Sequence, residues 1–299
     1  MSEKTITRRD ALLGAGAIGV VGAGALAGAG VIGLVGSEEP AGEPVVVAAF
    51  RSGGIPVEDP VAAAWDDAPE ATVPLAAQQV APPRLPYAGV ADLRVRALHD
   101  GETVAFRLQW EDAEVSDLDG VHRFHDAVAV MLPTRAGTPP AITMGAAGSP
   151  THILQWRATW ERDLAGKTGV DQLYPRVVHD VMPDDVLPPA TARLYWVGRA
   201  AGNPLSQKER TTPIEQIVAE GFGTTTHLPR DDARGHGVHD GSSWTVALGF
   251  PSRREGIGAP LDPGLTWSVA FAVWIGEQAN RGGRKHYANW VPFRLAARA

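Results

Sequence analysis

The sequence predicts an all-β protein, an antiparallel β-sandwich of two sheets with long loops and one or two short helices. Short segments with alternating apolar residues recur along the chain, which is the pattern of half-buried strands. Turn-forming residues separate these segments, and the 299 residues include 34 glycines and 24 prolines. Helical periodicity is rare. Many strands without alternating helices favour a sandwich over an α/β fold.

The strands are expected to follow one another along most of the chain. The longest hairpin is predicted for residues 93–112, where apolar residues alternate on both sides of an Asp100-Gly101 turn. In the strand predicted at residues 126–133, the alternation places Met131 on the face opposite Val130. Further strands are expected at residues 152–160, 192–198, 242–251, 266–276 and 289–296.

Only one segment has clear helical features. Pro213 suits the first turn of a helix over residues 212–221, and Gly221 suits its end. The sequence contains no internal repeat that would divide the strands among similar units. We therefore expect the sandwich to form one domain over residues 45–299.

The N-terminus predicts export from the cytoplasm. Arg8 and Arg9 precede an uncharged stretch rich in alanine and glycine, which resembles a twin-arginine export signal. The same stretch is long enough to anchor the chain in a membrane. We expect residues 1–36 to be an export signal or an anchor and residues 37–44 to be a linker. The protein is then periplasmic, or attached to the outer face of the cytoplasmic membrane.

Composition excludes several classes of partner and cofactor. The formal net charge of −7 argues against nucleic acid as a partner, because such binding needs a concentrated basic surface. The chain has no cysteine. This excludes disulfides, iron–sulfur clusters held by cysteine, and haem attached covalently through cysteine. Any redox cofactor must be held non-covalently by other side chains.

Two histidine pairs stand at the spacing H-x-x-H-D. His122 and His125 form one pair, and His236 and His239 form the other. This spacing could supply ligands to a transition metal, but in loops before strands it does not make the side chains converge, so we favour ordinary loop residues. The chain also lacks a G-x-S-x-G motif. The sequence therefore gives no evidence of a self-contained catalytic site.

Lys285 and Met144 are the two residues whose type and position are least expected. Only four of the 27 lysines and arginines are lysines, and Lys285 lies in a glycine-flanked loop between Trp274 and Trp290. Lysine differs from arginine because it can lose its proton and become a neutral amine. Met144 begins a glycine-rich loop that leads into a predicted strand. Ordinary alternatives are a solvated lysine and a methionine that fills a gap in the core.

The order and spacing of many segments resemble one protein family. The chain is similar to the haem b-binding gamma subunits of periplasmic molybdoenzymes, the group of ethylbenzene dehydrogenase, dimethylsulfide dehydrogenase, selenate reductase and chlorate reductase. The resemblance covers most of residues 59–290, including "RALHDGETVAFRLQWED", "TMGAAGSPTHILQW" and "VAFAVWIGEQANRGGRKHYANW". It implies a two-sheet sandwich related to some carbohydrate-binding modules. It also implies one non-covalent b-type haem per chain.

The resemblance further implies which residues hold the haem. Met144 and Lys285 match the family's axial ligands, and Trp274 and Trp290 would form walls of the pocket. The sequence departs from the family's pattern at two places. Met131 stands where a polar residue is usual and offers another sulfur. His286 stands where a small residue is common and offers another nitrogen.

The function implied is electron relay without catalysis. Family members form a heterotrimer with a molybdopterin catalytic subunit and an iron–sulfur beta subunit. Their haem passes electrons between those clusters and an external cytochrome or quinol-linked carrier. Two alternatives are an exported carbohydrate- or ligand-binding module without haem, and a periplasmic structural subunit that has lost its haem.

Overall fold

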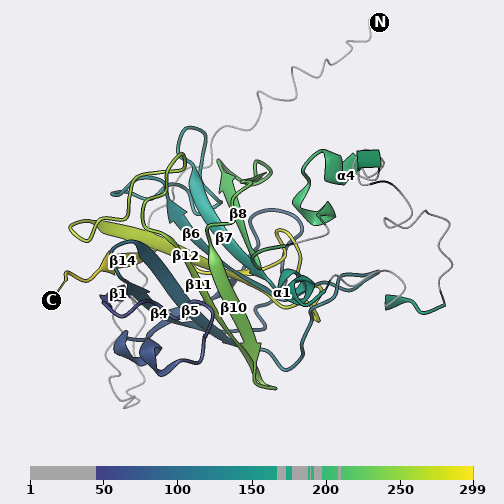
Figure 1. Cartoon of the computed structure of the whole chain (residues 1–299), viewed down its shortest axis with the longest axis horizontal. Coiled ribbons are helices and arrows are strands. Elements are labelled where there is room, and N and C mark those ends of the chain that lie inside the picture. Colours follow the sequence, from purple (N-terminus) through teal and green to yellow (C-terminus); the bar gives the residue numbers. More distant parts are fainter. Residues whose placement is uncertain are drawn as a thin grey trace, which may run out of the picture. The chain divides into compact units, whose positions relative to one another are not determined.

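The computed structural model describes residues 45–166, 173–176, 188, 190–191, 197–207 and 210–298 (Figure 1). The predicted export segment, residues 1–36, and the predicted linker, residues 37–44, lie outside these residues and stay predictions. Residues 192–196 of one predicted strand also lie outside them. Within the described part of the chain, no helix combines the length and apolarity needed to span a membrane.

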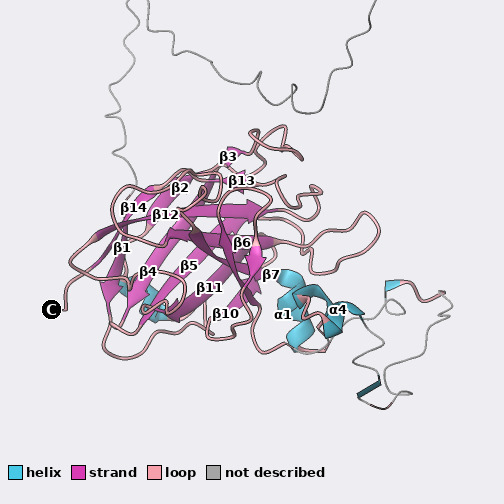
Figure 2. Cartoon of the chain, turned by 90° about the horizontal axis from the view of Figure 1, so that it is seen from above, coloured by secondary structure: helices cyan, strands magenta, loops and turns pink. Residues whose placement is uncertain are grey.

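The described residues form a sandwich of two sheets (Figures 1 and 2). Sheet A has the strand order β10 (Arg234–His239), β11 (Ser243–Pro251), β5 (Thr103–Glu111), β4 (Asp92–His99), β1 (Val46–Phe50) and β14 (Val291–Leu295), with β2 (Ala71–Pro74) beside β4. Sheet B has the order β12 (Thr266–Trp274), β6 (Ala127–Pro133), β7 (Thr151–Arg157), β8 (Ile214–Ala219) and β9 (Thr226–His227). Two short strands, β13 (His286–Tyr287) and β3 (Ala76–Ala77), extend it beyond β12.

One strand belongs to both sheets. The first part of β12 pairs with β14 in sheet A through residues 266–269, and its second part pairs with β6 in sheet B through residues 270–274. The pairing is antiparallel except at β1, which lies parallel to both β4 and β14. The predicted sandwich is therefore confirmed, with one parallel strand that the sequence did not indicate.

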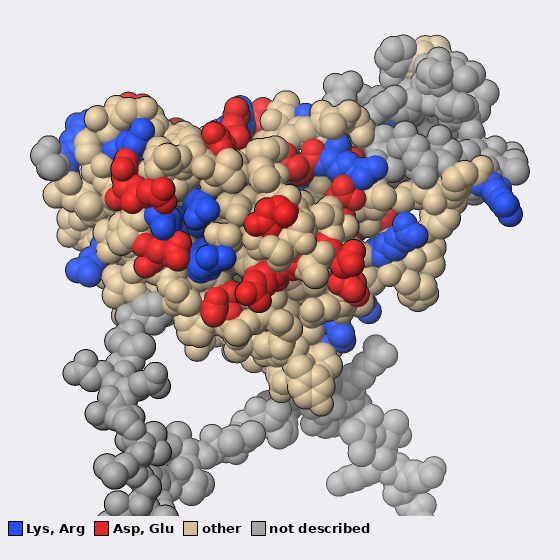
Figure 3. All heavy atoms as spheres, turned by 90° about the horizontal axis from the view of Figure 1, so that it is seen from below, with Lys and Arg blue, Asp and Glu red and all other residues tan. Residues whose placement is uncertain are grey.

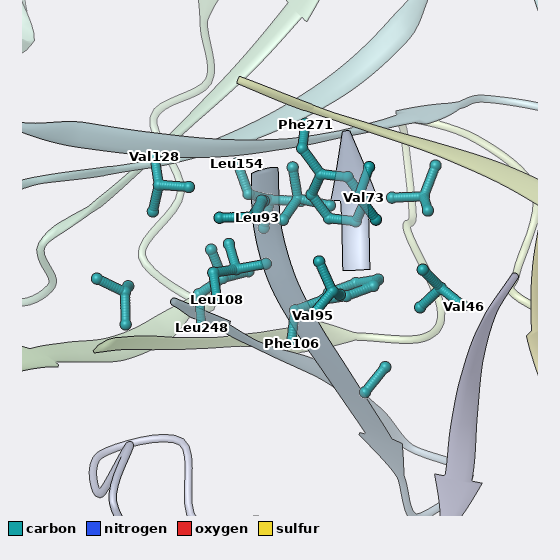
Figure 4. Packing of buried hydrophobic residues seen from close by; sticks show 14 of the residues in the cluster. Val46, Val73, Leu93, Val95, Phe106, Leu108, Val128, Leu154, Leu248 and Phe271 are labelled. Atoms are coloured by element: carbon teal, nitrogen blue, oxygen red, sulfur yellow. The ribbon is translucent and has the colours of Figure 1, made fainter. Parts of the chain in front are cut away.

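The main core fills the space between the sheets (Figure 4). Sheet A contributes Phe106 and Leu108 from β5, and sheet B contributes Val128 and Val130 from β6. Phe106 also packs edge-on against Phe271 of β12, with ring centroids 6.1 Å apart. Burying these side chains contributes about 2 kcal/mol each, so this core supplies much of the stability of the sandwich.

The prediction of a helix for residues 212–221 is wrong. The segment contains β8, which pairs with β7 along its length. Ile214 faces the main core, whereas Ile217 faces away from it and packs in a second apolar cluster on the outer side of sheet B. A strand with apolar residues on both faces has no simple alternation, and its pattern cannot be told from that of a helix.

Other elements differ in detail from the predictions. The strand predicted at residues 152–160 ends at Arg157 and continues as helix α1 (Ala158–Leu164). Val197 and Gly198, the end of another predicted strand, belong to the short helix α4 (Val197–Ala200). Two 3-10 turns, η2 (Ala63–Asp67) and η4 (Pro204–Ser206), are also present.

Charged side chains on the surface are mixed in sign. The face drawn in Figure 3 carries acidic and basic residues next to one another. Arg96 of β4, for example, lies 2.8 Å from Asp66 and 3.1 Å from Glu70. Asp66 is largely exposed, and such pairs contribute at most about 1 kcal/mol.

Candidate functional site

A cavity of about 700 Å³ lies over the outer face of sheet B. Its floor follows from a repeated pattern in two neighbouring strands. In β6 and β12, large residues point into the main core, while Ala127, Ala129, Ala270 and Ala272 point outward. Small side chains on the outer face leave room for a ligand against the sheet, and the volume suits a small organic molecule or cofactor.

The strand register arranges the floor in rows. Ala272 of β12 lies opposite Ala129 of β6, and this pair continues to Gln155 of β7 and Glu215 of β8. The next row runs from Ala270 through Met131 and Ile153 to Ile217. The floor is thus apolar over β12 and β6, and toward β8 the first row becomes polar while the second stays apolar. A flat amphipathic ligand fits this division.

Met144 reaches the cavity from the loop before β7. It has φ 67, in the left-handed region, which costs a non-glycine residue about 1 kcal/mol or more. The conformation is held by its neighbours, because the N–H of Gly221 donates to the Met144 carbonyl at 2.9 Å and the N–H of Gly145 donates to the Ala141 carbonyl at 2.9 Å. The Met144 side chain thus lines the cavity from a strained backbone conformation that the surrounding loop maintains.

Gly145 is expected to be essential for this loop. It has φ 89, and a Cβ there would lie 2.8 Å from the Ser149 carbonyl oxygen and 2.9 Å from that of Ala219. Gly148 has φ 74, and a Cβ there would meet nothing within 4 Å. Urea unfolding should therefore show Gly145→Ala destabilising the protein by roughly 2 kcal/mol more than Gly148→Ala, since both lose the same backbone freedom. Equal losses would show that the close packing beside Met144 is unimportant.

Lys285 lines the same cavity from a different loop, just before β13. Its backbone is fixed by Gln78, whose N–H donates to the Lys285 carbonyl at 3.0 Å. The Gln78 side chain also donates to the Gly283 carbonyl at 2.6 Å, and Trp274 donates to the Gly282 carbonyl at 3.0 Å. Three hydrogen bonds thus hold the loop that carries the lysine.

The Lys285 amine has no carboxylate partner among the described residues. Among the described residues it forms no hydrogen bond or ion pair, and its nearest assigned contact is the Trp274 ring, 4.9 Å from Nζ to the centroid. Burial beside apolar side chains lowers the pKa of Lys285 to about 8, because the charged ammonium loses its hydration. The amine therefore loses its proton more easily than that of an exposed lysine.

The alternative nitrogen, His286, points away from the cavity. It is buried, and its Nε2 accepts hydrogen bonds from the N–H groups of Gly89 at 2.8 Å and Val90 at 3.3 Å. Its Nδ1 lies 3.3 Å from the Val273 carbonyl. Successive residues of a strand face opposite sides, so Lys285 and His286 cannot both face the cavity. Both ring nitrogens of His286 are already engaged.

Met131 and the tryptophans take different positions. Met131 lies in the floor of the cavity, on the face predicted from the sequence, and is 8% exposed. Trp274 lines the cavity. Trp290 packs against the outer cluster and donates through Nε1 to the Pro140 carbonyl at 2.8 Å, so it supports the loop before Met144 rather than lining the cavity. The structure thus brings Met144, Lys285, Met131 and Trp274 together.

Polar side chains occupy one corner of the cavity. Arg157 forms an ion pair with Glu215, donates to Gln155 at 3.1 Å, and lies 3.4 Å from Nε2 of His125. His227 lies 3.4 Å from the other Glu215 oxygen. Sequence reasoning missed this corner, because its members come from β7, β8, β9 and the loop before β6 and share no motif.

Asp126 ties together the loops beside this corner. One of its carboxylate oxygens accepts from the N–H of Gly276 at 2.7 Å, and the other accepts from the N–H of Ser116 at 2.7 Å and Nε1 of Trp244 at 3.0 Å. Asp112 is buried near this carboxylate and has no partner for Oδ2. Burial, followed by repulsion from Asp126, raises the pKa of Asp112 to about 7.

Asp112 should make stability depend on pH. Its pKa is higher in the folded protein than in the unfolded chain, so the folded state holds an extra proton between about pH 4 and pH 7. Stability should fall as pH rises through this window. Asp112→Asn cannot ionise and is expected to be more stable than the parent by roughly 1–3 kcal/mol at pH 8, with little difference at pH 4. Urea melts at both values measure this, and equal differences at both would contradict it.

The two H-x-x-H-D pairs do not converge on a common point. His125 lies 2.7 Å from Asp119, and His236 lies 2.8 Å from Glu161. Nε2 of His239 lies 2.9 Å from the Asp112 carbonyl. His236 and His239 belong to β10 and not to a loop, which corrects the prediction. In the part of the chain that the structure describes, no group of three or more histidine or acidic side chains could hold a metal ion.

Comparisons with known proteins identify related chains. The family model described as ethylbenzene dehydrogenase matches residues 62–286. A protein of Haloferax mediterranei, assigned by name as a respiratory nitrate reductase heme subunit, is 25% identical over 84% of this chain and 76% of its own length. The chlorate reductase subunit gamma of Ideonella dechloratans is 24% identical over 80% of each chain.

Solved structures were also compared. A carbohydrate binding module family 9 from Caldicellulosiruptor kristjanssonii, in complex with cellotriose, aligns with a TM-score of 0.41 and 8% identity. The alignment covers 85% of this chain and 94% of that module.

Proposed function

Since the chain belongs to the ethylbenzene dehydrogenase family, we propose that it is a non-catalytic electron-transfer subunit that holds one b-type haem between Met144 and Lys285. The observation that carries the proposal is the meeting of these two side chains in one cavity, over a floor of alanines. Met144 and Lys285 are 141 positions apart in the sequence and come from unrelated loops. Two related proteins are named as a heme subunit and a gamma subunit of reductases, which supports the same function.

The residues present fit an iron porphyrin. A thioether and a neutral amine are both suitable axial ligands, and the apolar floor suits the flat face or edge of the macrocycle. Losing the proton at pH 7 costs Lys285 about 1.4 kcal/mol from a pKa of about 8, whereas it costs about 5 kcal/mol from the ordinary value of 10.5. Arginine could not take this role, because its guanidinium stays protonated and has no lone pair to donate.

The chain's own residues determine which chemistry is allowed. When bound, haem supplies a one-electron carrier. If Met144 and Lys285 both held the iron, the chain would leave no position for a substrate, and the haem would transfer electrons without catalysis. Methionine as a ligand raises the reduction potential. The alanine floor and Trp274 would keep water from one side of the haem, which would raise the potential further.

We propose the corresponding partners and location by the same reasoning. The subunit would belong to a complex with a molybdopterin catalytic subunit and an iron–sulfur subunit. The name of the chlorate reductase relative, a gamma subunit, supports membership of a complex with other subunits. It would exchange electrons with an external cytochrome or a quinol-linked carrier. Export would proceed through the segment with Arg8 and Arg9, to the periplasm or the outer face of the membrane.

A carbohydrate-binding module is the alternative function. Sugar-binding surfaces depend on exposed aromatic rings against which a sugar can stack. Among the described tryptophans, seven have at most 8% of their surface exposed, and Trp290 is half-buried. The tryptophans therefore support the haem-pocket proposal over the sugar-binding one.

Haemin titration of the full-length protein tests the function. One equivalent should bind and give the absorption spectrum of a low-spin b-type haem, with the pyridine haemochrome of non-covalent haem. Ala129→Phe places a large ring in the floor of the cavity and should weaken haemin binding by at least 10-fold, because the ring occupies space that the ligand needs. The fold should be preserved, since Ala129 points away from the main core. Ala63→Phe, on an exposed turn, is the control and should bind normally. A colourless protein that binds cellotriose would reverse the choice of function.

A further inference from the structure

The polar corner of the cavity is not used by the two proposed ligands. Met144 and Lys285 would hold the iron, and the alanine floor would contact the macrocycle. Two arginines also line the cavity, Arg157 from β7 and Arg281 from the loop after β12. Both contact the segment before β6, since Arg157 is 3.4 Å from the His125 ring nitrogen and Arg281 lies over the neighbouring Phe124 ring at 4.6 Å.

Both arginines have donor capacity to spare. Arg281 is exposed, donates to the Ala279 carbonyl at 2.9 Å, and has no carboxylate partner among the described residues. Arg157 is paired with Glu215, yet its Nε is buried without a hydrogen-bond acceptor. The other ionisable groups at this corner are His125, which is paired with Asp119, and His227, which faces Glu215. Among the arginines and carboxylates that line the cavity, Arg157 and Arg281 against Glu215 leave one positive charge in excess.

We propose that Arg157 and Arg281 bind the two propionate carboxylates of the haem, an inference that rests on the proposed function. Haem carries two carboxylates on one edge, and burying them without donors would be costly. The alanines and Met131 of β6 and β12 offer no such donors, and Arg157 and Arg281 are the only arginines among the described residues that line the cavity. Arginine binds a carboxylate through two parallel N–H groups, which fixes direction as well as energy. Arg157 and Arg281, here called the arginine corner, would therefore determine which edge of the haem faces β7 and the loop after β12.

Haemin and haemin dimethyl ester, titrated separately into the full-length protein, test the inference. Esterification removes both carboxylates and leaves the iron and the ring unchanged. The parent protein should bind haemin more tightly than the ester. Arg281→Met should reduce this preference by roughly 10-fold or more, since a hydrogen bond to a charged group is lost. Arg253→Met, an exposed arginine outside the cavity lining, is the matched control and should keep the full preference.

Arg157 requires a paired change. Arg157→Met alone would leave Glu215 buried without its partner, so the variant Arg157→Met/Glu215→Gln removes both charges. It should also lower the preference for haemin, while the ester still gives a low-spin spectrum. If every variant keeps the parent's preference for haemin, the arginine corner does not bind propionates and the inference is wrong. If the parent gives no low-spin spectrum with either compound, the proposed function itself fails.

Discussion

Lys285→Ala is expected to convert the haemin-loaded protein from low-spin to high-spin and to weaken haemin binding by at least 10-fold. Removing the amine leaves one axial position without a protein ligand, and even a residue that only supports a ligand changes affinity by about 10- to 100-fold. Lys285→Arg should behave in the same way, although it keeps a positive charge, because guanidinium has no lone pair for iron. Absorption spectra of the loaded variants measure the spin state.

His286 provides the control for this experiment. His286→Gln keeps a side-chain acceptor for the N–H of Gly89, so the loop should be preserved. Its low-spin spectrum is expected to match that of the parent. Loss of the low-spin spectrum in His286→Gln, together with its survival in Lys285→Ala, would assign the ligand to the histidine. If neither Lys285 variant changes the spectrum, Lys285 is not an iron ligand.

Met144→Leu should have the second large effect. Leucine nearly conserves the volume of methionine but removes the sulfur, so the loop and the cavity should be kept while the ligand is lost. We expect a high-spin spectrum, or a reduction potential lower by tenths of a volt if water or another group replaces the thioether. Met131→Leu makes the same chemical change in the floor of the same cavity and should leave the spectrum unchanged. The reverse result would make Met131 the ligand.

The sequence predicted the architecture because strand patterns with one polar face are easy to recognise. The hairpin of β4 and β5 illustrates this, with an aspartate and a glycine at the turn between two alternating strands. β8 was mistaken for a helix because it is covered on both faces, by the main core and by the outer cluster. The same double covering occurs in β6 and β12, where it reflects the cavity. Unlike β8, these two strands alternate large and small residues, so their period can still be recognised.

The candidate site was only partly predictable. Lys285 and Met144 were found through unusual residue choice and resemblance to the family, and the structure adds that both reach one cavity. The outer alanines of β6 and β12 left a signal in the sequence, since large and small residues alternate in "AVAV" and "VAFAV". That signal was not read as a binding surface. The arginine corner left none, because it exists only when β7 and the loop after β12 come together.

The passage of β12 from one sheet to the other has a consequence for electron transfer. Its first residues are fixed in the packed core beside β14, and the same strand then forms the floor that carries Ala270 and Ala272. Close-packed interiors have low compressibility, so a floor continuous with the core cannot shift far when a bound group gains or loses charge. Small structural rearrangement means a low reorganisation energy. Under the proposed function, the shared strand would therefore allow electrons to move rapidly in either direction.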